Sequence, residues 1–387
     1  MKKLYTGMLG MMLLAATAYP NEAKAQGGVI DVLGGGISDA NKLMNAYLGP
    51  MGESFAIGLG QNWFNTANPL KLGRFNLQFG ASLVMIPESK QTFDAAGLNL
   101  QNLIPTSNEA PTLFGKGAGP DYILRVEDPN NPGQYLNVDT LAGLTRGLGL
   151  AMMAAPFAQL NLGLIKGTEI GVRYLPSLDL GSLSGGNVGG SISLWGVGVK
   201  HDIKQWIPVV KKLPFSMSGY FNYTRLSFNM DVSMAGPESN TYAAYTGPGD
   251  VVGFDYANGT AGDYSSQAIL LNSTSMGFGL IVSKKLPVIT PYLSLGFQNA
   301  TFSLKTAGDY AILSGMAVNS DPLAPEPGAF REQYSVFTDP INISPDAISA
   351  FRYGVGLRAK LLIFGLHAEY FGVGEFSGVN VGLSLGF

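Results

Sequence analysis

The sequence contains no cysteine and only two histidines, His201 and His367. Without cysteine the chain can form neither a disulfide nor a thiolate metal site, and no lipid can be attached to a cysteine. Two histidines cannot make a zinc site of three histidines, and the HExxH and paired-cysteine motifs are missing. We therefore expect no metal ion and no other cofactor.

Charged residues are also scarce. They make up 13% of the chain, whereas 46% is hydrophobic and 52 residues are glycine. Soluble domains usually carry about 25% charged residues, so a water-exposed surface of this composition would be short of charge. The formal net charge of −3 provides no basic face. Nucleic acid is therefore not an expected partner.

Long hydrophobic runs are missing as well, since no stretch approaches the ~18 to 20 apolar residues of a membrane-spanning helix. The chain begins with Lys2 and Lys3, an apolar run over 9–18, and a small-residue pattern that ends at Ala25. This order is typical of a secretory signal peptide. We expect residues 1–25 to be removed and the exported protein to begin at about Gln26.

The C-terminus shows a strict alternation of apolar residues with small or polar ones. The apolar set is Val379, Val381, Leu383, Leu385 and Phe387. Period two places all of them on one face, as in a transmembrane strand with lipid outside and a lumen inside. A strand that ends in Phe resembles the C-terminal strand recognised by the outer-membrane barrel assembly machinery. That machinery and outer-membrane lipid are therefore expected partners, and a strand of a soluble sandwich is the alternative.

Eleven segments have the length and pattern of strands. They are 53–64, 75–85, 151–164, 170–178, 189–201, 214–232, 266–284, 290–306, 351–361, 363–372 and 378–387. A bacterial barrel should have an even number, so we predict a transmembrane antiparallel β-barrel of about 12 strands, with ten to fourteen open. In 214–232 the apolar parity changes, which a β-bulge near Thr224 would explain.

The connections between these segments alternate in length. Short ones face long polar ones at 87–150, 233–265 and 307–347, as the short periplasmic turns and long external loops of outer-membrane barrels do. The last of these contains five prolines and is predicted to be a solvated loop. We thus divide the mature chain into an N-terminal segment, 26–52, and a barrel, 53–387.

The N-terminal segment is rich in glycine at first and then follows a helical pattern. Leu43, Met44, Tyr47 and Leu48 share one helical face after Ser38, a candidate N-cap. A short helix here could plug the lumen, cover the periplasmic mouth of the barrel or serve only as a spacer.

Charged residues with inward parity are the candidate site. The lumen-lining set is Glu169, Arg173, Arg352, Arg358, Lys360, His367 and Glu369. Such a set could line a path for anionic solutes or form salt bridges that fill the interior. His367 and Glu369 share a face and could be hydrogen-bonded or form a catalytic dyad. A lipid hydrolase would instead need its nucleophile near the membrane surface, so we do not expect an enzyme.

One stretch carries a family resemblance. Residues 58–67 read GLGQNWFNTA and are followed by KLGRF at 71–75, with HDIKQW at 201–206 and KLPF at 212–215. Together they resemble an uncharacterised family of Bacteroidetes outer-membrane β-barrel proteins over most of the mature chain. The resemblance implies a bacterial outer-membrane location and no particular activity. In layout the chain is more distantly similar to long-chain fatty acid transporter barrels, which is an analogy of fold.

A lipid-modifying enzyme is the function that we expect least. Two other functions remain open. The first is a passive channel or transporter for small molecules, which could be hydrophobic. The alternative is a non-transporting surface or structural barrel that binds a partner through its external loops. An open lumen would favour the first and a filled lumen the second.

Overall fold

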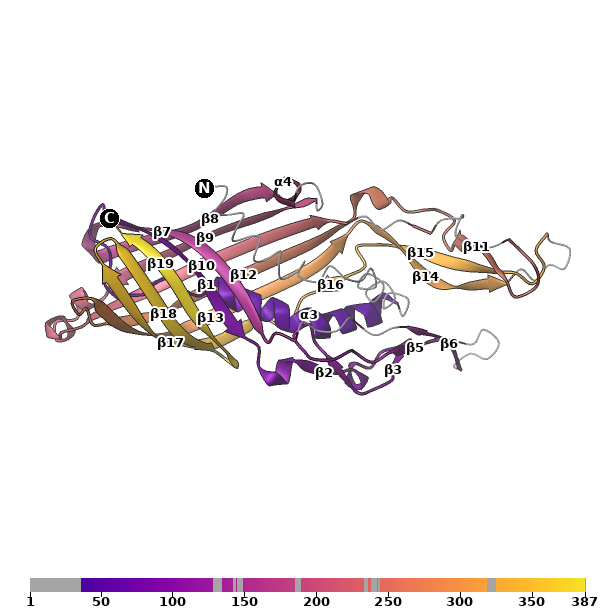
Figure 1. The fold of residues 1–387 in the computed structure, drawn as a ribbon, viewed down its shortest axis with the longest axis horizontal. Coiled ribbons are helices and arrows are strands. Elements are labelled where there is room, and N and C mark those ends of the chain that lie inside the picture. Colours follow the sequence, from indigo (N-terminus) through magenta and orange to yellow (C-terminus); the bar gives the residue numbers. More distant parts are fainter. Residues whose placement is uncertain are drawn as a thin grey trace.

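The computed structural model describes residues 36–127, 134–141, 144, 149–184, 189–232, 236–237, 242, 244–318 and 325–386. Ten long strands form a closed antiparallel barrel (Figure 1). They are β1 (Phe75–Met85), β7 (Met152–Gly163), β8 (Thr168–Asp179), β9 (Gly190–Asp202), β10 (Ser216–Asp231), β12 (Ala268–Ser283), β13 (Ile289–Ala307), β17 (Ile348–Leu361), β18 (Phe364–Val373) and β19 (Phe376–Gly386). Neighbours in the wall follow chain order, β1 pairs with β19, and β12 pairs with β13 across the short turn at 284–288.

Successive side chains of each wall strand point alternately outward and into the lumen. On β18, Leu366 points outward and is 59% exposed, whereas His367 points inward and is 5% exposed. Every wall strand pairs with a neighbour on each side, which satisfies most of the backbone polar groups within the wall, although β7 and β8 pair only over four residues near their short connection, 160–163 with 169–172. The strands β10, β12 and β13 contain 16, 16 and 19 residues. A bilayer needs only ~9 to 11, so these strands continue beyond the apolar band.

The two ends of the barrel differ. At one end, which we call the turn end, the connections are short and the wall begins at Phe75 and finishes at Gly386. Three short 3-10 helices lie there: η4 (Ile165–Gly167), η5 (Lys204–Trp206) and η6 (Val210–Lys212). At the other end, the loop end, long connections fold into further elements that extend away from the barrel (Figure 1).

The elements of the loop end are short strands and helices. They are η2 (Glu88–Lys90), β2 (Thr92–Asp94), η3 (Ala96–Leu98), β3 (Leu103–Pro105), β4 (Glu109–Pro111), β5 (Tyr122–Glu127), β6 (Tyr135–Leu141), α4 (Leu180–Ser184), β11 (Val251–Tyr256), η8 (Tyr264–Ser266), β14 (Asp309–Val318), β15 (Phe330–Thr338) and β16 (Asn342–Ile343). The prediction that 307–347 is a solvated loop was wrong, because β14 and β15 pair there and β11 adds to β15. The prolines of this segment lie outside the two strands, so they do not interrupt the pairing.

The helix α3 (Ile37–Leu59) enters the barrel from the loop end (Figure 1). A strand at 53–64 was therefore a wrong prediction, and ten strands rather than twelve close the wall. The cause is the surroundings of this segment. Phe55, Ile57 and Leu59 alternate as in a strand, but the wall encloses the helix, so apolar residues are tolerated on every side and periodicity does not mark its structure. Among the described residues no helix is long and apolar enough to cross a bilayer.

Small residues let α3 fit against the wall. A Cβ atom at Gly58 would lie 2.7 Å from the Cβ of Ala155, and one at Gly52 would overlap the ring of Phe302. Near the start of α3, the buried carboxylate of Asp39 accepts hydrogen bonds from the backbone N–H groups of Gln101 and Asn102 at 2.8 and 2.7 Å. Glycine thus sets the fit inside the barrel, and Asp39 ties the helix to the loop end.

The parity change in β10 does not come from a bulge. The pairing of β10 with β9 and β12 runs through Thr224 without a register shift, so a bulge there was a wrong prediction. Leu226 points inward and packs with Leu59 and Ile192 beneath α3. The inner face of β10 is apolar where it meets the helix and polar farther down, which produces the change in pattern.

Candidate functional site in the barrel lumen

The chain leaves α3 and continues along the lumen as residues 59–68, which we call the lumen segment. Asn62 has a φ of 63°, a left-handed conformation that asparagine tolerates better than most residues. Farther on, the backbone N–H of Gly73 donates to the carbonyl of Gly163 at 3.1 Å, so the segment reaches the turn end. It therefore extends from the end of the helix to the start of the first wall strand.

Arg173 of β8 holds the beginning of the lumen segment. Its Nη1 and Nη2 donate to the carbonyls of Leu59 and Gln61 at 3.0 and 2.7 Å, and its Nε donates to Oε1 of Gln159 at 2.9 Å. The guanidinium also lies 4.2 Å from the ring centroid of Trp63. All three hydrogen bonds go to uncharged oxygens, so this buried cation is stabilised by bonds and ring contact.

Trp63 packs where the wall carries glycine. A Cβ at Gly198 of β9 would lie 2.5 Å from Cε3 of the indole. Gln159 Nε2 donates to the carbonyl of Trp63 at 2.9 Å. Bare backbone on β9 thus leaves the space that the large ring fills.

An ion pair between β17 and β18 lies next to Gln61. Arg352 Nη2 donates to Glu369 Oε1 at 2.8 Å, and its Nε donates to Gln61 Oε1 at 2.7 Å. Glu369 also accepts from Ser294 Oγ and Asn380 Nδ2, both at 3.1 Å. The ion pair is buried and further hydrogen-bonded on both sides, as a buried pair requires.

A second ion pair lies near the turn end. Lys200 Nζ is 3.1 Å from Glu169 Oε2 and donates to the carbonyl of Thr66 at 3.0 Å. The same Glu169 oxygen accepts the backbone N–H of Leu70 at 2.8 Å. Both members of the pair therefore bind the chain inside the lumen as well as each other.

His367 lies between two asparagines of the lumen segment. Its Nε2 is 2.6 Å from Asn62 Oδ1, and its Nδ1 is 3.1 Å from Asn65 Nδ2. This arrangement fits a neutral ring with the proton on Nε2. Glu369 is occupied by Arg352, Ser294 and Asn380 instead. The expected hydrogen-bonded pair of His367 and Glu369 was therefore a wrong prediction, and the structure does not join them as a catalytic dyad either.

The other residues that we singled out from the sequence are placed as follows. Arg358 is half-buried on the inner face, and Lys360 is exposed at the turn end. On the outer face of β19, Val381 and Leu383 are exposed and Val379 and Leu385 are half-buried. Phe387 lies outside the described residues. The inward charges converge on the lumen segment, except for Arg358 and Lys360 at the turn end.

Sequence reasoning missed the polar residues that complete the site. Gln61 bonds Gln298 of β13 as well as Arg352, and Gln78 of β1 donates to the carbonyl of Asn62 at 3.3 Å. Gln78, Gln298 and the missed Lys200 have inward parity on their strands, which was the available signal. All three bond the lumen segment, which the alternation within each strand could not indicate because the lumen segment belongs to a different part of the chain.

A family model with the description "Family of unknown function (DUF6588)" matches residues 1–387. The chain belongs to this family. A comparison of the DUF6588 chain with curated proteins gave no match.

Solved structures similar to the DUF6588 chain include three bacterial proteins, each 8% identical to it. The attachment invasion locus protein Ail of Yersinia pestis has a TM-score of 0.24, and the match covers 82% of this chain and 99% of Ail. The translocator domain of autotransporter NalP from Neisseria meningitidis has a TM-score of 0.29, and the match covers 88% of this chain and 94% of the NalP domain. The toluene transporter TbuX of Ralstonia pickettii has a TM-score of 0.22, and the match covers 86% of this chain and 97% of TbuX.

The type of fold follows from the wall of the DUF6588 chain itself. A closed antiparallel barrel with an apolar outer face and a polar inner face is a barrel of the outer-membrane type.

Proposed function

We propose that this protein is an outer-membrane barrel closed by its own α3 and lumen segment, and that its loop end binds a partner outside the cell. One observation carries the proposal: the lumen segment is bonded to side chains on strands all around the wall. The bonds come from β1, β7, β8, β9, β10, β12, β17 and β18. A free path for solute would have to break a large part of this set.

The orientation follows from the connections. In outer-membrane barrels the short turns face the periplasm and the long connections face outward. The turn end would therefore face the periplasm and the loop end the exterior. Because α3 begins at the loop end and the lumen segment descends from it, the chain would pass the membrane once inside the lumen before the wall begins.

The loop end supports a binding role because it is built as structure. Glu332 of β15 accepts hydrogen bonds from the hydroxyls of Tyr242 and Tyr334 at 2.6 and 2.8 Å. Arg331 forms an ion pair with Asp255 of β11 at 2.8 Å. Backbone pairing joins β11, β15 and β14 into one sheet that projects beyond the barrel (Figure 1), and the ion pair adds a side-chain link between β15 and β11. Such a sheet presents a defined surface to a partner.

Gated transport is a second candidate, and the polarity of the lumen favours it. The lumen segment touches the wall through many hydrogen bonds, and the buried Trp63 Nε1 and Tyr220 hydroxyl have no hydrogen-bond partner within the described part of the chain. Polar atoms of this kind can be hydrated, so the interface could separate with water between its faces. In that case the lumen segment would be a gate.

Conductance across planar bilayers distinguishes the two candidates. The wild-type protein should show no stable single-channel conductance. A variant with Thr66→Cys and Ser283→Cys can lock the segment, because the two hydroxyl oxygens are 3.4 Å apart and the chain has no other cysteine. The oxidised variant should be equally silent.

The outcomes separate cleanly. Conductance by the wild type that disappears in the oxidised variant and returns on reduction would establish a gate and refute the closed barrel. Conductance that persists in the oxidised variant would refute both, because it would show a path that bypasses the lumen segment. Silence of all forms, with the folded protein confirmed by a heat-dependent gel shift, supports the closed barrel.

A further inference from the structure

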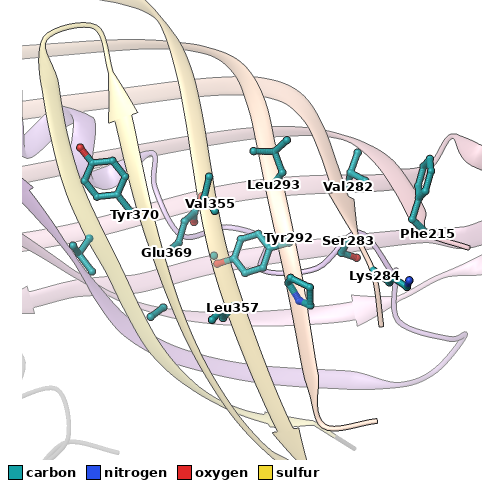
Figure 2. Close-up of a pocket in the computed structure, with 14 residues that line it drawn as sticks. Phe215, Val282, Ser283, Lys284, Tyr292, Leu293, Val355, Leu357, Glu369 and Tyr370 are labelled. Carbon is teal, nitrogen blue, oxygen red and sulfur yellow. The ribbon is translucent and has the colours of Figure 1, made fainter. Parts of the chain in front are cut away.

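A groove of about 680 Å³ lies on the outer face of the wall, across β12, β13, β17 and β18 (Figure 2). One side is a row of outward side chains that pair directly across the strands: Val282, Leu293, Val355 and Tyr370. The other side contains Leu357 and Ala368, which pair with each other. The lining is almost entirely apolar, and Ala368 leaves room where a larger residue would fill the groove.

The end of the groove nearest the turn end is basic. Lys284 contributes to its lining, and Lys285 follows in the same turn. Both are exposed, and the turn sequence Lys284-Lys285-Leu286-Pro287-Val288 contains no acidic residue. The backbone N–H of Lys360 donates to the carbonyl of Val288 at 2.9 Å, which places another lysine position beside this turn. An apolar cleft therefore ends at two lysines that no carboxylate in the turn neutralises.

We propose that this groove binds one anionic phospholipid of the periplasmic leaflet. An acyl chain would occupy the space between the two apolar rows, and the headgroup phosphate would lie at Lys284 and Lys285. An apolar band with lysines at its edge is the pattern by which side chains reach lipid headgroups. The proposal rests on the proposed function, because that places this wall in lipid and the turn end at the periplasmic surface.

The lysines decide the class of lipid. Two ammonium groups attract a headgroup with a net negative charge more than a zwitterionic one. The occupant is therefore of the phosphatidylglycerol type. The main alternative occupants are a second copy of this chain, whose apolar wall could pack on the same groove, and lipid of any headgroup held only as solvent.

Native mass spectrometry of the full chain in detergent tests the site. Phosphatidylglycerol and phosphatidylcholine with identical acyl chains are titrated separately. One phosphatidylglycerol should bind more tightly than the rest, and more tightly than phosphatidylcholine. Lys284→Gln with Lys285→Gln should weaken the binding of phosphatidylglycerol by about 25-fold, because each basic residue near an anionic group contributes about five-fold. The binding of phosphatidylcholine should be unchanged.

A second variant fills the groove without changing charge. Ala368→Phe should abolish the tight phosphatidylglycerol site. Ala158→Phe, an outward position on β7, and Lys166→Gln, in the turn between β7 and β8, are matched controls on another part of the wall and should have no effect. Each variant is used only after its heat-dependent gel shift matches the wild type.

Four results would overturn the site. They are equal binding of the two lipids, phosphatidylglycerol binding that survives Ala368→Phe, an equal loss in the control variants, and a dimer that Ala368→Phe disrupts. A protein that stays monodisperse without detergent would instead refute the membrane placement, and with it the proposed function. The two failures are therefore distinguishable.

Discussion

The ion pair between Arg352 and Glu369 gives a quantitative prediction for the lumen. The substitution Glu369→Gln keeps the shape of the side chain and removes its charge. Arg352 would then lie buried without a carboxylate, because its other bonds go to Gln61 Oε1 and Ser294 Oγ at 2.7 and 2.6 Å. Removal of one partner from a buried pair typically costs about 3–5 kcal/mol. We expect Glu369→Gln to lower the free energy of unfolding by about 3 kcal/mol.

Removal of both charges should lower the free energy of unfolding less than Glu369→Gln does. Arg352→Met with Glu369→Leu replaces the pair by apolar side chains, which is often nearly neutral for a buried pair. Gln61 Oε1 loses a donor in this variant, and an unsatisfied buried acceptor costs about 1–3 kcal/mol. The double variant should therefore be more stable than Glu369→Gln alone, although less stable than the wild type.

Urea unfolding of the vesicle-inserted protein measures these differences, with tryptophan fluorescence as the signal. Glu375→Gln is the matched control, because the exposed Glu375 pairs with the half-buried Lys90 at 3.3 Å and ion pairs near the surface contribute about 0–1 kcal/mol. The reasoning fails if Glu369→Gln unfolds at the wild-type midpoint. It also fails if the double variant is the less stable of the two.

Three further predictions concern the lumen, the outer wall and the loop end. Gly198→Ala should cost about 1–3 kcal/mol by overpacking against Trp63, whereas Gly247→Ala, with open space around it, should be neutral in the same unfolding assay. Leu383→Arg on the outer wall, where Leu383 is 58% exposed, should cost about 2–4 kcal/mol, and Leu362→Arg at the turn end at most about 1 kcal/mol; equal costs would show that the wall does not face lipid. Burial, followed by the hydrogen bond to Glu332, raises the pKa of Tyr242 to about 12, so its stabilising effect is complete below pH 10 and is lost as the pH rises towards 12. The difference in near-ultraviolet circular dichroism between the wild type and Tyr242→Phe isolates this residue from the other tyrosines; it should stay constant up to about pH 10 and change as the pH approaches 12, and a difference that already changes around pH 10 would contradict the assignment.

The wall could be predicted from the sequence because its chemistry repeats every two residues. Leu383 and Glu369 were assigned to the correct faces by parity alone, since a strand between lipid and a polar lumen has one apolar face. The segment 53–64 escaped this reasoning. Ile57 lies inside the barrel with protein on every side. A helix in such surroundings needs no polar face, so its sequence lacks the amphipathic pattern by which a helix is recognised.

The partners within the lumen could not be predicted in the same way. Parity placed Glu169 and Arg173 inside, but pairing depends on register and on the descent of the lumen segment. Glu169 pairs with Lys200 of the adjacent strand, and Arg173 bonds the carbonyl groups of residues 59 and 61 instead of a carboxylate. Carbonyl groups carry no sequence signal, so a site built on them becomes visible only in three dimensions.

The central claim is that the lumen segment fills the barrel in the membrane. The pair Thr66→Cys and Ser283→Cys tests it most directly when disulfide formation is followed in native membranes. With the hydroxyl oxygens 3.4 Å apart, the two side chains face each other closely enough for a disulfide. We expect oxidation of nearly all molecules, with neither thiol open to a maleimide reagent beforehand. A folded, heat-modifiable protein whose thiols both react with maleimide and form no disulfide would contradict the claim.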